Sequence, residues 1–321
     1  MDSRTHPVAE TTSEDSTNAA SVIRRRAFLI GAGASLVVTA CGRGATRAAP
    51  TPSPRARGLV FVPAAVELAV GDERLAFGVF RNDVPLPYTR DVSGLVAMRS
   101  PTGREQKPVR VRTFPIVRSK GGEDAERASE RATLVLVGRV EFDAPGRWDA
   151  VARLDIGGRR EVAVGPIDVL EQSRTVGIDG KAIEFATPTT GDARGVDPIC
   201  TRIPPCTMHD VSLDAALGNG KPSVVVFATP ALCMSRMCGP DVDVVEKVHL
   251  ARPGEANFVH VEIYRNLGGT EVAPATAAWS IDKAGEPWVF FVSADGKVTD
   301  RLSGPVGEWE VDKGVDLLAR G

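Results

Sequence analysis

The stretch Phe227-Ala-Thr-Pro-Ala-Leu-Cys233-Met-Ser-Arg-Met-Cys238-Gly-Pro240 separates an apolar run from an amphipathic segment. The run, Ser223–Phe227, is uninterrupted, rich in β-branched residues and preceded by Gly220-Lys221-Pro222, which predicts a buried strand. The segment over 241–250 has a helical period, and the residues on one face are Val242, Val245, His249 and Leu250. The two cysteines are therefore predicted to lie where a strand ends and a helix begins.

A cysteine at such a junction is suited to redox chemistry. Backbone N–H groups point out of a helix N-terminus, so a thiolate there is stabilised and its pKa falls. We expect Cys233, nearer the strand, to be exposed and to attack a partner disulfide, and Cys238 to resolve the mixed disulfide. Arg236 is a candidate to stabilise the thiolate. A structural disulfide and two buried free thiols remain alternatives.

Composition limits the possible classes of function. The chain has 321 residues, 25% of them charged and 43% hydrophobic, which is ordinary for a soluble protein of about two domains. Its net charge is −2. Because no basic block lies outside the N-terminus, we expect no nucleic-acid partner.

The N-terminus has the features of an export signal. The apolar run from Ala27 to Ala40 is shorter than the about 20 residues of a membrane-spanning helix, and it fits the core of a secretory signal. Arg25-Arg-Ala-Phe-Leu29 resembles the bacterial twin-arginine signal. Val38-Thr-Ala-Cys41 resembles a lipobox, which implies that residues 1–40 are removed and that Cys41 carries a lipid.

A Pro-rich segment over 41–57 would then act as a tether between lipid and folded domain. The resemblance implies a lipid-anchored protein on the extracytoplasmic face of a bacterial cell membrane, where disulfides persist.

Residues 58–170 are predicted to be all-β. Short strands separated by turn signals are typical of an antiparallel sandwich. The stretch Glu141–Arg153, with a Pro-Gly turn before Trp148, resembles the end of many immunoglobulin-like domains. The expected strands are Leu59–Val62, Val66–Val70, Leu75–Arg81, Gly94–Met98, Val109–Val117, Thr133–Phe142, Trp148–Ile156 and Glu161–Leu170. A linker over 171–180 follows.

The second domain is predicted to span 181–321 and to begin with a loop. Cys200 and Cys206 lie in it, separated by five residues that include Pro204-Pro205. We favour a Cys200–Cys206 disulfide because the two are close in sequence. The alternative is that one of them pairs with Cys233 or Cys238, since four cysteines permit three pairings.

The rest of this domain follows a recognisable order: strand, cysteine helix, strand, helix, Pro-led strand, hairpin, strand, helix. The expected elements are a helix from Ser212 to Gly218, a strand over 257–264, a helix over 273–281, a strand from Pro287 to Val292, a turn at 293–297, a strand over 298–302 and a helix over 308–318. From Val211 to Gly321 this order resembles the thioredoxin fold, and Gly220-Lys-Pro222 before the strand resembles membrane-anchored thioredoxin-like proteins. The resemblance implies that Pro287 is a cis proline beside the cysteines. We therefore expect a multidomain chain, an immunoglobulin-like sandwich followed by an α/β thioredoxin-like domain.

Three features depart from the thioredoxin pattern. The cysteines are spaced C-x4-C, Leu232 stands where a Trp usually precedes the first cysteine, and the Ser223–Phe227 strand has no acidic residue to accept a proton. The spacing also requires a loop between the cysteines if their sulfurs are to bond at about 2.05 Å.

Taken together, these features predict a thiol–disulfide oxidoreductase without metal or cofactor. Its partners would be thiols or disulfides of exported proteins and a membrane or extracytoplasmic redox protein. One alternative is a copper protein similar to the Sco type, because thiolate and thioether ligands suit Cu(I); its candidate ligands are Cys233, Met234, Met237 and Cys238 with His209, His249 or His260. Another is an inert thioredoxin-like binding module. No zinc-spacing motif stands out.

Overall fold

The computed structural model describes residues 58–117 and 132–320. All the described residues belong to a single compact unit. The predicted signal over 1–40, the predicted lipid site Cys41 and the tether over 41–57 lie outside the described residues and remain predictions. No helix in the described ranges is long and apolar enough to cross a membrane.

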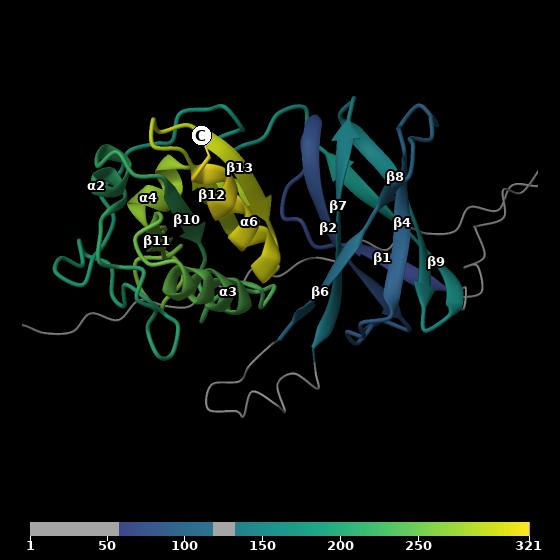
Figure 1. The fold of residues 1–321 in the computed structure, drawn as a ribbon, viewed down its shortest axis with the longest axis horizontal. Helices are drawn as coiled ribbons and strands as arrows, with labels where there is room; N and C mark the ends of the chain where they lie inside the picture. The colour runs from purple at the N-terminus through teal and green to yellow at the C-terminus, as the bar shows by residue number, and fades with distance from the viewer. Residues whose placement is uncertain (1–57, 118–131, 321) are drawn as a thin grey trace, which may run out of the picture. The chain divides into compact units, whose positions relative to one another are not determined.

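The nine strands between Leu59 and Val169 form one hydrogen-bonded sheet (Figure 1). Along the sheet the order is β5-β4-β8-β9-β1-β2-β7-β6, and β3 pairs with β2. The strands are β1 Leu59–Pro63, β2 Gly71–Arg81, β3 Val84–Pro85, β4 Val92–Arg99, β5 Val109–Arg110, β6 Arg112–Ile116, β7 Thr133–Phe142, β8 Gly146–Ile156 and β9 Arg159–Val169.

This β domain, residues 58–170, differs from the prediction in three ways. β1 pairs antiparallel with β2 but parallel with β9, so the sheet is mixed. The expected strand Val66–Val70 is reduced to a single bridge between Ala69 and Leu170. The expected strand Val109–Val117 is split between β5 and β6, which pair with β4 and β7 respectively. The immunoglobulin-like assignment stays a prediction.

The core of the β domain contains the aromatic residue that leads β8. Trp148 is fully buried, its indole N–H donates to the carbonyl of Ala144 at 3.0 Å, and its ring meets that of Phe142 edge-on. Burying a large apolar side chain contributes about 1.5–3 kcal/mol. The turn before β8 therefore places both the apolar ring and its polar N–H in favourable surroundings.

Residues 181–320 contain a four-stranded sheet of order β11-β10-β12-β13. β10 is parallel to β11 and antiparallel to β12, and β12 is antiparallel to β13. This region, residues 181–320, is called the C-terminal domain below. Its strands are β10 Ser223–Phe227, β11 Asn257–Val261, β12 Trp288–Val292 and β13 Val298–Ser303, and its helices are α2 Leu213–Gly218, α3 Cys238–Ala251, α4 Pro274–Ala278, α5 Ile281–Ala284 and α6 Glu308–Leu318.

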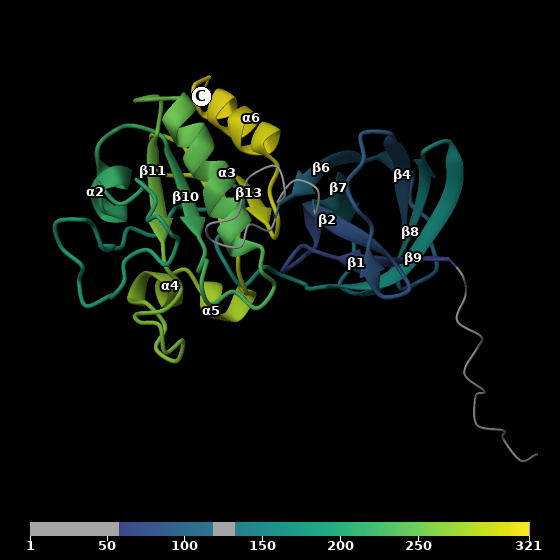
Figure 2. The same ribbon diagram turned by 90° about the horizontal axis from the view of Figure 1, so that it is seen from below.

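Helices cover both faces of this sheet (Figure 2). Val224 and Val226 of β10 share a core with α3 and α6, whereas Val225 and Phe227 share a core with α2, α4 and α5. Because side chains alternate along a strand, a strand buried on both faces must be apolar at every position. That explains the uninterrupted run in the sequence.

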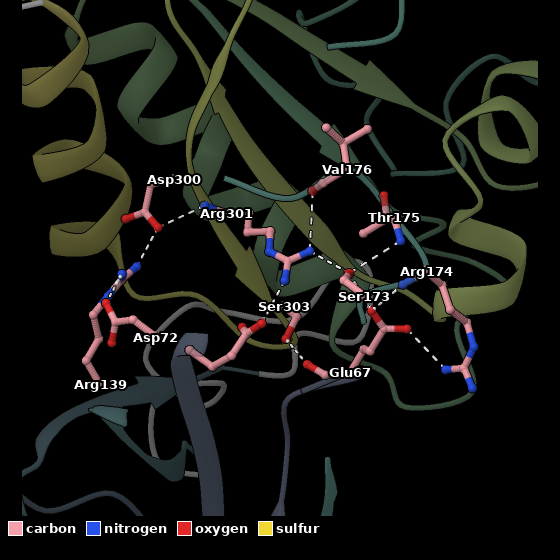
Figure 3. Close-up of polar contacts among 11 residues, drawn as sticks. Glu67, Asp72, Arg139, Ser173, Arg174, Thr175, Val176, Asp300, Arg301 and Ser303 are labelled. Carbon is pink, nitrogen blue, oxygen red and sulfur yellow. Dashed lines mark hydrogen bonds and ion pairs between the residues drawn. The ribbon is translucent and has the colours of Figure 1, made fainter. Parts of the chain in front are cut away.

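Polar side chains connect the β domain to the C-terminal domain. Arg301 of β13 donates to Glu73 at 2.7 Å and to Ser173 at 2.6 Å, and Glu67 accepts from Ser173 and Arg174 (Figure 3). Such charge-assisted bonds are stronger than neutral ones. They hold β13, an edge strand of the four-stranded sheet, against the beginning of β2.

Candidate functional site

The loop between β10 and α3 positions the two cysteines. Thr229 caps a tight turn, since its carbonyl accepts from the N–H groups of Leu232 at 3.2 Å and Cys233 at 3.0 Å. Arg236 has a φ of 59°, in the left-handed region, and its N–H donates to the carbonyl of Cys233. Cys238 is the first residue of α3. The chain thus makes the loop that the C-x4-C spacing requires and places Cys233 in front of a helix N-terminus.

The sulfur of Cys233 is surrounded by donors. The backbone N–H of Cys238 donates to it at 3.4 Å, and the Ser235 hydroxyl lies 3.1 Å away. Cys233 is 8% exposed and Cys238 is fully buried. Cys233 is therefore the more accessible of the two sulfurs, although the prediction that it is exposed was too strong.

These contacts separate the pKa values of the two thiols. The Cys238 thiol, the Ser235 hydroxyl and the backbone N–H groups of Cys238 and Met237 lower the pKa of Cys233 to about 5, against the opposing effect of burial. Burial, followed by the neighbouring Cys233 thiolate, raises the pKa of Cys238 far above its usual range. At neutral pH the site holds one thiolate, on Cys233, and one thiol, on Cys238.

Glu286 completes this site, and the sequence analysis did not identify it. Its carboxylate and the two sulfurs lie within 4.8 Å of one another. Burial, and then the charge of Cys233, raise the pKa of Glu286 to about 7. The Glu286–Pro287 peptide bond is cis, as the resemblance implied. The sequence shows only that an acidic residue precedes the proline of the Pro-led strand, and the tertiary structure brings that residue to the cysteines.

Two expectations about neighbouring residues are not supported. Arg236 is exposed and is not among the groups that most affect the pKa of Cys233. The copper alternative needs thioether and imidazole ligands, but Met234 is 97% exposed. Among the described His, Cys, Asp and Glu residues, the third possible ligand grouped with the two cysteines is the Glu286 carboxylate, whereas His209 and His260 group with Cys200 and Cys206.

Cys200 and Cys206 lie together, but not as the predicted disulfide. Both are free, and their sulfurs are 3.8 Å apart, well beyond the about 2.05 Å of a disulfide. His260 from β11 lies against them, with its Nδ1 atom 3.3 Å from the sulfur of Cys206. These two cysteines belong to a group separate from that of Cys233 and Cys238. The imidazole beside the sulfurs is the contact that sequence proximity could not reveal.

The cysteine loop also contacts the β domain. Met237, directly before α3, packs with Trp309 of α6 against a small apolar cluster. That cluster consists of Phe114, Ile116, Val135 and Val137 from β6 and β7. The β domain therefore forms part of the support of the loop that carries Cys233.

The strand order, the cysteines at the start of α3 and the cis proline before β12 define a thioredoxin-like fold in the C-terminal domain. Among solved structures, the chain is similar to a thioredoxin-family thiol:disulfide interchange protein from Chlorobium tepidum TLS. The two are 20% identical, the match covers 46% of this chain and 99% of that one, and the TM-score is 0.26.

A second similar structure is the reduced N-terminal domain of PilB from N. meningitidis. It is 16% identical, the match covers 35% of this chain and 90% of that domain, and the TM-score is 0.24. No protein-family model and no curated protein matches the chain. The thioredoxin-like fold follows from the strand order, the position of Cys238 at the start of α3 and the cis proline before β12.

Proposed function

We propose that this chain is a thiol–disulfide oxidoreductase, anchored by a lipid on the extracytoplasmic face of a bacterial membrane, that acts on exported proteins. The observation that carries the proposal is the pairing of a low-pKa thiol, Cys233, with a buried high-pKa thiol, Cys238, at the start of α3. Groups whose environments push their pKa values apart take different chemical roles. Here the roles are those of attacking and resolving thiol.

In the first step the Cys233 thiolate attacks a disulfide of the partner protein. A bond forms between the Cys233 sulfur and one partner sulfur, the partner disulfide breaks, and the second partner sulfur leaves as a thiolate and takes up a proton. The N–H of Cys238 holds Cys233 in the thiolate form until then. Pro287 follows Glu286 in cis linkage, and by resemblance to thioredoxins we propose that it borders the place where the partner chain would lie.

In the second step Cys238 resolves the mixed disulfide. It must first lose its proton, and Glu286 is the nearby group with a pKa, about 7, suited to accept it. The Cys238 sulfur then attacks that of Cys233, and the partner leaves with its second thiol. In total, two electrons pass from the cysteine pair to the partner. One proton comes from Cys238 and reaches the partner sulfur released in this step by way of Glu286, and the other comes from solvent, because Cys233 begins as a thiolate. The same steps in reverse oxidise a partner dithiol.

The cellular location is proposed from the sequence motifs alone. Arg25-Arg-Ala-Phe-Leu29 and Val38-Thr-Ala-Cys41 occur in the order and spacing of an exported lipoprotein. The tether over 41–57 and the β domain, proposed here as an immunoglobulin-like sandwich, would hold the cysteines away from the membrane surface.

Trapping of mixed disulfides tests the proposal. The full-length chain carrying Cys238→Ser should retain partner proteins through Cys233, and these complexes should disappear from non-reducing gels when reductant is added. Cys233→Ser is the matched control and should trap none. Equal amounts of complex from Cys238→Ser and from the double variant Cys233→Ser/Cys238→Ser would overturn the proposal.

A further inference from the structure

A second cluster of potential ligands lies outside the proposed redox site. It consists of Cys200, Cys206, His209 and His260, all of them buried. One ligand atom from each residue lies within 4.8 Å of all the others. Three of the residues come from a single loop, in a C-x5-C-x2-H pattern, and the fourth comes from β11.

The separations among the two sulfurs and His260 match those of ligands around a tetrahedral metal ion. Ligands that bind zinc at about 2.3 Å for sulfur and about 2.0–2.1 Å for nitrogen are separated by roughly 3.8 Å between two sulfurs and roughly 3.5 Å between sulfur and nitrogen. The Cys200 and Cys206 sulfurs are 3.8 Å apart. The Nδ1 atom of His260 is 3.7 Å from the first sulfur and 3.3 Å from the second.

The His260 ring is oriented as a metal ligand would be. Its Nε2 atom is 3.1 Å from the carbonyl oxygen of Ala228 and 4.0 Å from the carboxylate of Glu262. Both groups are acceptors, so a proton on Nε2 would be hydrogen-bonded and would leave the lone pair of Nδ1 directed at the sulfurs. Metal-bound histidines commonly donate their other N–H to a carbonyl or carboxylate in this way.

His209 supplies the independent observation. It is 2% exposed, and neither ring nitrogen has a hydrogen-bond partner among the described residues. Buried polar groups without partners are costly, and each requires an explanation. The ring lies beside that of His260, with centroids 5.0 Å apart. A metal ion bound by the two sulfurs and His260 would give His209 its missing partner.

The loop that carries three of these residues is held in place by charged groups. The N–H of Thr207 donates to the carboxylate of Glu246 at 3.0 Å, and the N–H of Thr201 donates to Glu262. The N–H of Cys206 donates to the sulfur of Cys200 at 3.4 Å. The bonds from Thr201 and Thr207 thus position the loop without using a ligand residue, and the bond from Cys206 orients the Cys200 sulfur.

We propose that Cys200, Cys206, His209 and His260 form a closed, tetrahedral zinc site. Two sulfur and two nitrogen ligands in this geometry suit zinc, and four protein ligands leave no open position for catalysis, so the role of the site is structural. The zinc site would join the loop that carries Cys200, Cys206 and His209 to β11. That loop also contacts the loop between β10 and α3, because the Thr201 hydroxyl accepts from the N–H of Ala231 at 3.0 Å. The inference does not depend on the proposed thiol exchange.

Cobalt titration of the reduced full-length chain in the absence of oxygen tests this proposal. Co²⁺ should bind at one equivalent per chain, with the visible bands of tetrahedral cobalt and a thiolate charge-transfer band, and Zn²⁺ should displace it. Cys233→Ser/Cys238→Ser should give the same spectrum. His209→Ala should lose it, whereas His249→Ala, a histidine of α3 outside the cluster, should keep it.

A second measurement uses the unaltered sequence, so it tests the proposal even if the variants fail to fold. Bound Zn²⁺ should protect Cys200 and Cys206 from alkylation, as read by mass spectrometry of peptides, while Cys233 still reacts. Removing the zinc with a chelator should abolish that protection. The proposal is overturned if the reduced chain binds no Co²⁺ or Zn²⁺, if His209→Ala retains the tetrahedral spectrum, or if binding is lost in Cys233→Ser/Cys238→Ser.

Discussion

The backbone N–H of Cys238 donates to the sulfur of Cys233 at 3.4 Å, so the first residue of α3 stabilises the charge on a cysteine five positions earlier. In a C-x4-C segment this contact requires the chain to fold back, which it does at the left-handed Arg236, whose N–H donates to the carbonyl of Cys233. The helix N-terminus then acts on Cys233 from outside the helix. This contact, together with those from the Cys238 thiol and the Ser235 hydroxyl, should make Cys233 reactive as a thiolate.

Alkylation of Cys233 should titrate well below the range of an ordinary thiol. Because the pKa is lowered to about 5, the rate should reach half its maximum near pH 5 rather than near the roughly 8.5 of a free cysteine. The measurement is the pH dependence of iodoacetamide labelling of the peptide that contains Cys233. Ser235→Ala removes one of the stabilising donors and should move the midpoint upward. A midpoint above pH 8 in the unaltered chain would contradict the thiolate assignment.

Glu286→Gln should impair the resolving step and leave the attacking step intact. The variant keeps the shape of the side chain but cannot accept the proton of Cys238, and general-base assistance is typically worth on the order of 10² or more in rate. The two steps can be separated with an aromatic disulfide, whose two thiolates are released in sequence. Asp282→Asn, an exposed carboxylate on α5, is the matched control. Unchanged release of the second thiolate would remove Glu286 from the mechanism.

The stability of the reduced protein should depend on pH through Cys233. Its folded pKa, about 5, lies below its unfolded value of roughly 8.5, so the unfolded state binds more protons between these values. The stabilisation is fully present above pH 8.5 and is lost as pH falls through 5. The slope is at most about 1.4 kcal/mol per pH unit.

Urea unfolding of Glu286→Gln and of Cys233→Ser/Glu286→Gln, both reduced, isolates this effect. Glu286 must be absent from both because its raised pKa, about 7, acts in the opposite direction, removing stability as pH rises. The difference in unfolding free energy between the two variants should grow from pH 5.5 to pH 8.5. A difference that is independent of pH would show that Cys233 has an ordinary pKa.

The buried ion pair between Arg74 of the β domain and Glu310 of the C-terminal domain should affect the unfolding free energy of both domains. Arg74 of β2 donates to both carboxylate oxygens of Glu310 on α6, at 2.7 and 2.6 Å, and to the carbonyls of Ser303 and Pro305. Arg74→Met leaves a buried carboxylate without its partner and should cost about 3–5 kcal/mol of unfolding free energy.

Two further variants check this interpretation. Arg74→Met/Glu310→Leu removes both charges and should recover most of the lost free energy, because no unpaired charge remains. Arg81→Met breaks a more exposed pair with Glu161 and should cost no more than about 1 kcal/mol. If the double variant is as unstable as Arg74→Met, the loss arises from packing rather than from the unpaired carboxylate.

Local patterns predicted the elements of the C-terminal domain well. The run Ser223–Phe227 and the helix over 308–318 have the predicted bounds, because their burial on the sheet faces is encoded in apolar residues at strand and helix spacing. The mid-helix Gly314, a poor helix former, has a tertiary reason, since a Cβ there would collide with the ring of Phe291. In the β domain, Val66–Val70 has the composition of a strand, but only Ala69 pairs.

The sequence by itself determined the position of Cys233 and Cys238 between a buried strand and a helix, because strand and helix periods are local properties of the chain. Only the tertiary structure brought Glu286 to these sulfurs and His260 to Cys200 and Cys206. Glu286 is 53 and 48 positions from the two cysteines, and His260 is 60 and 54 positions from its pair. Contacts between residues so far apart are set by the order of strands in the sheet, and no periodicity in the sequence encodes them.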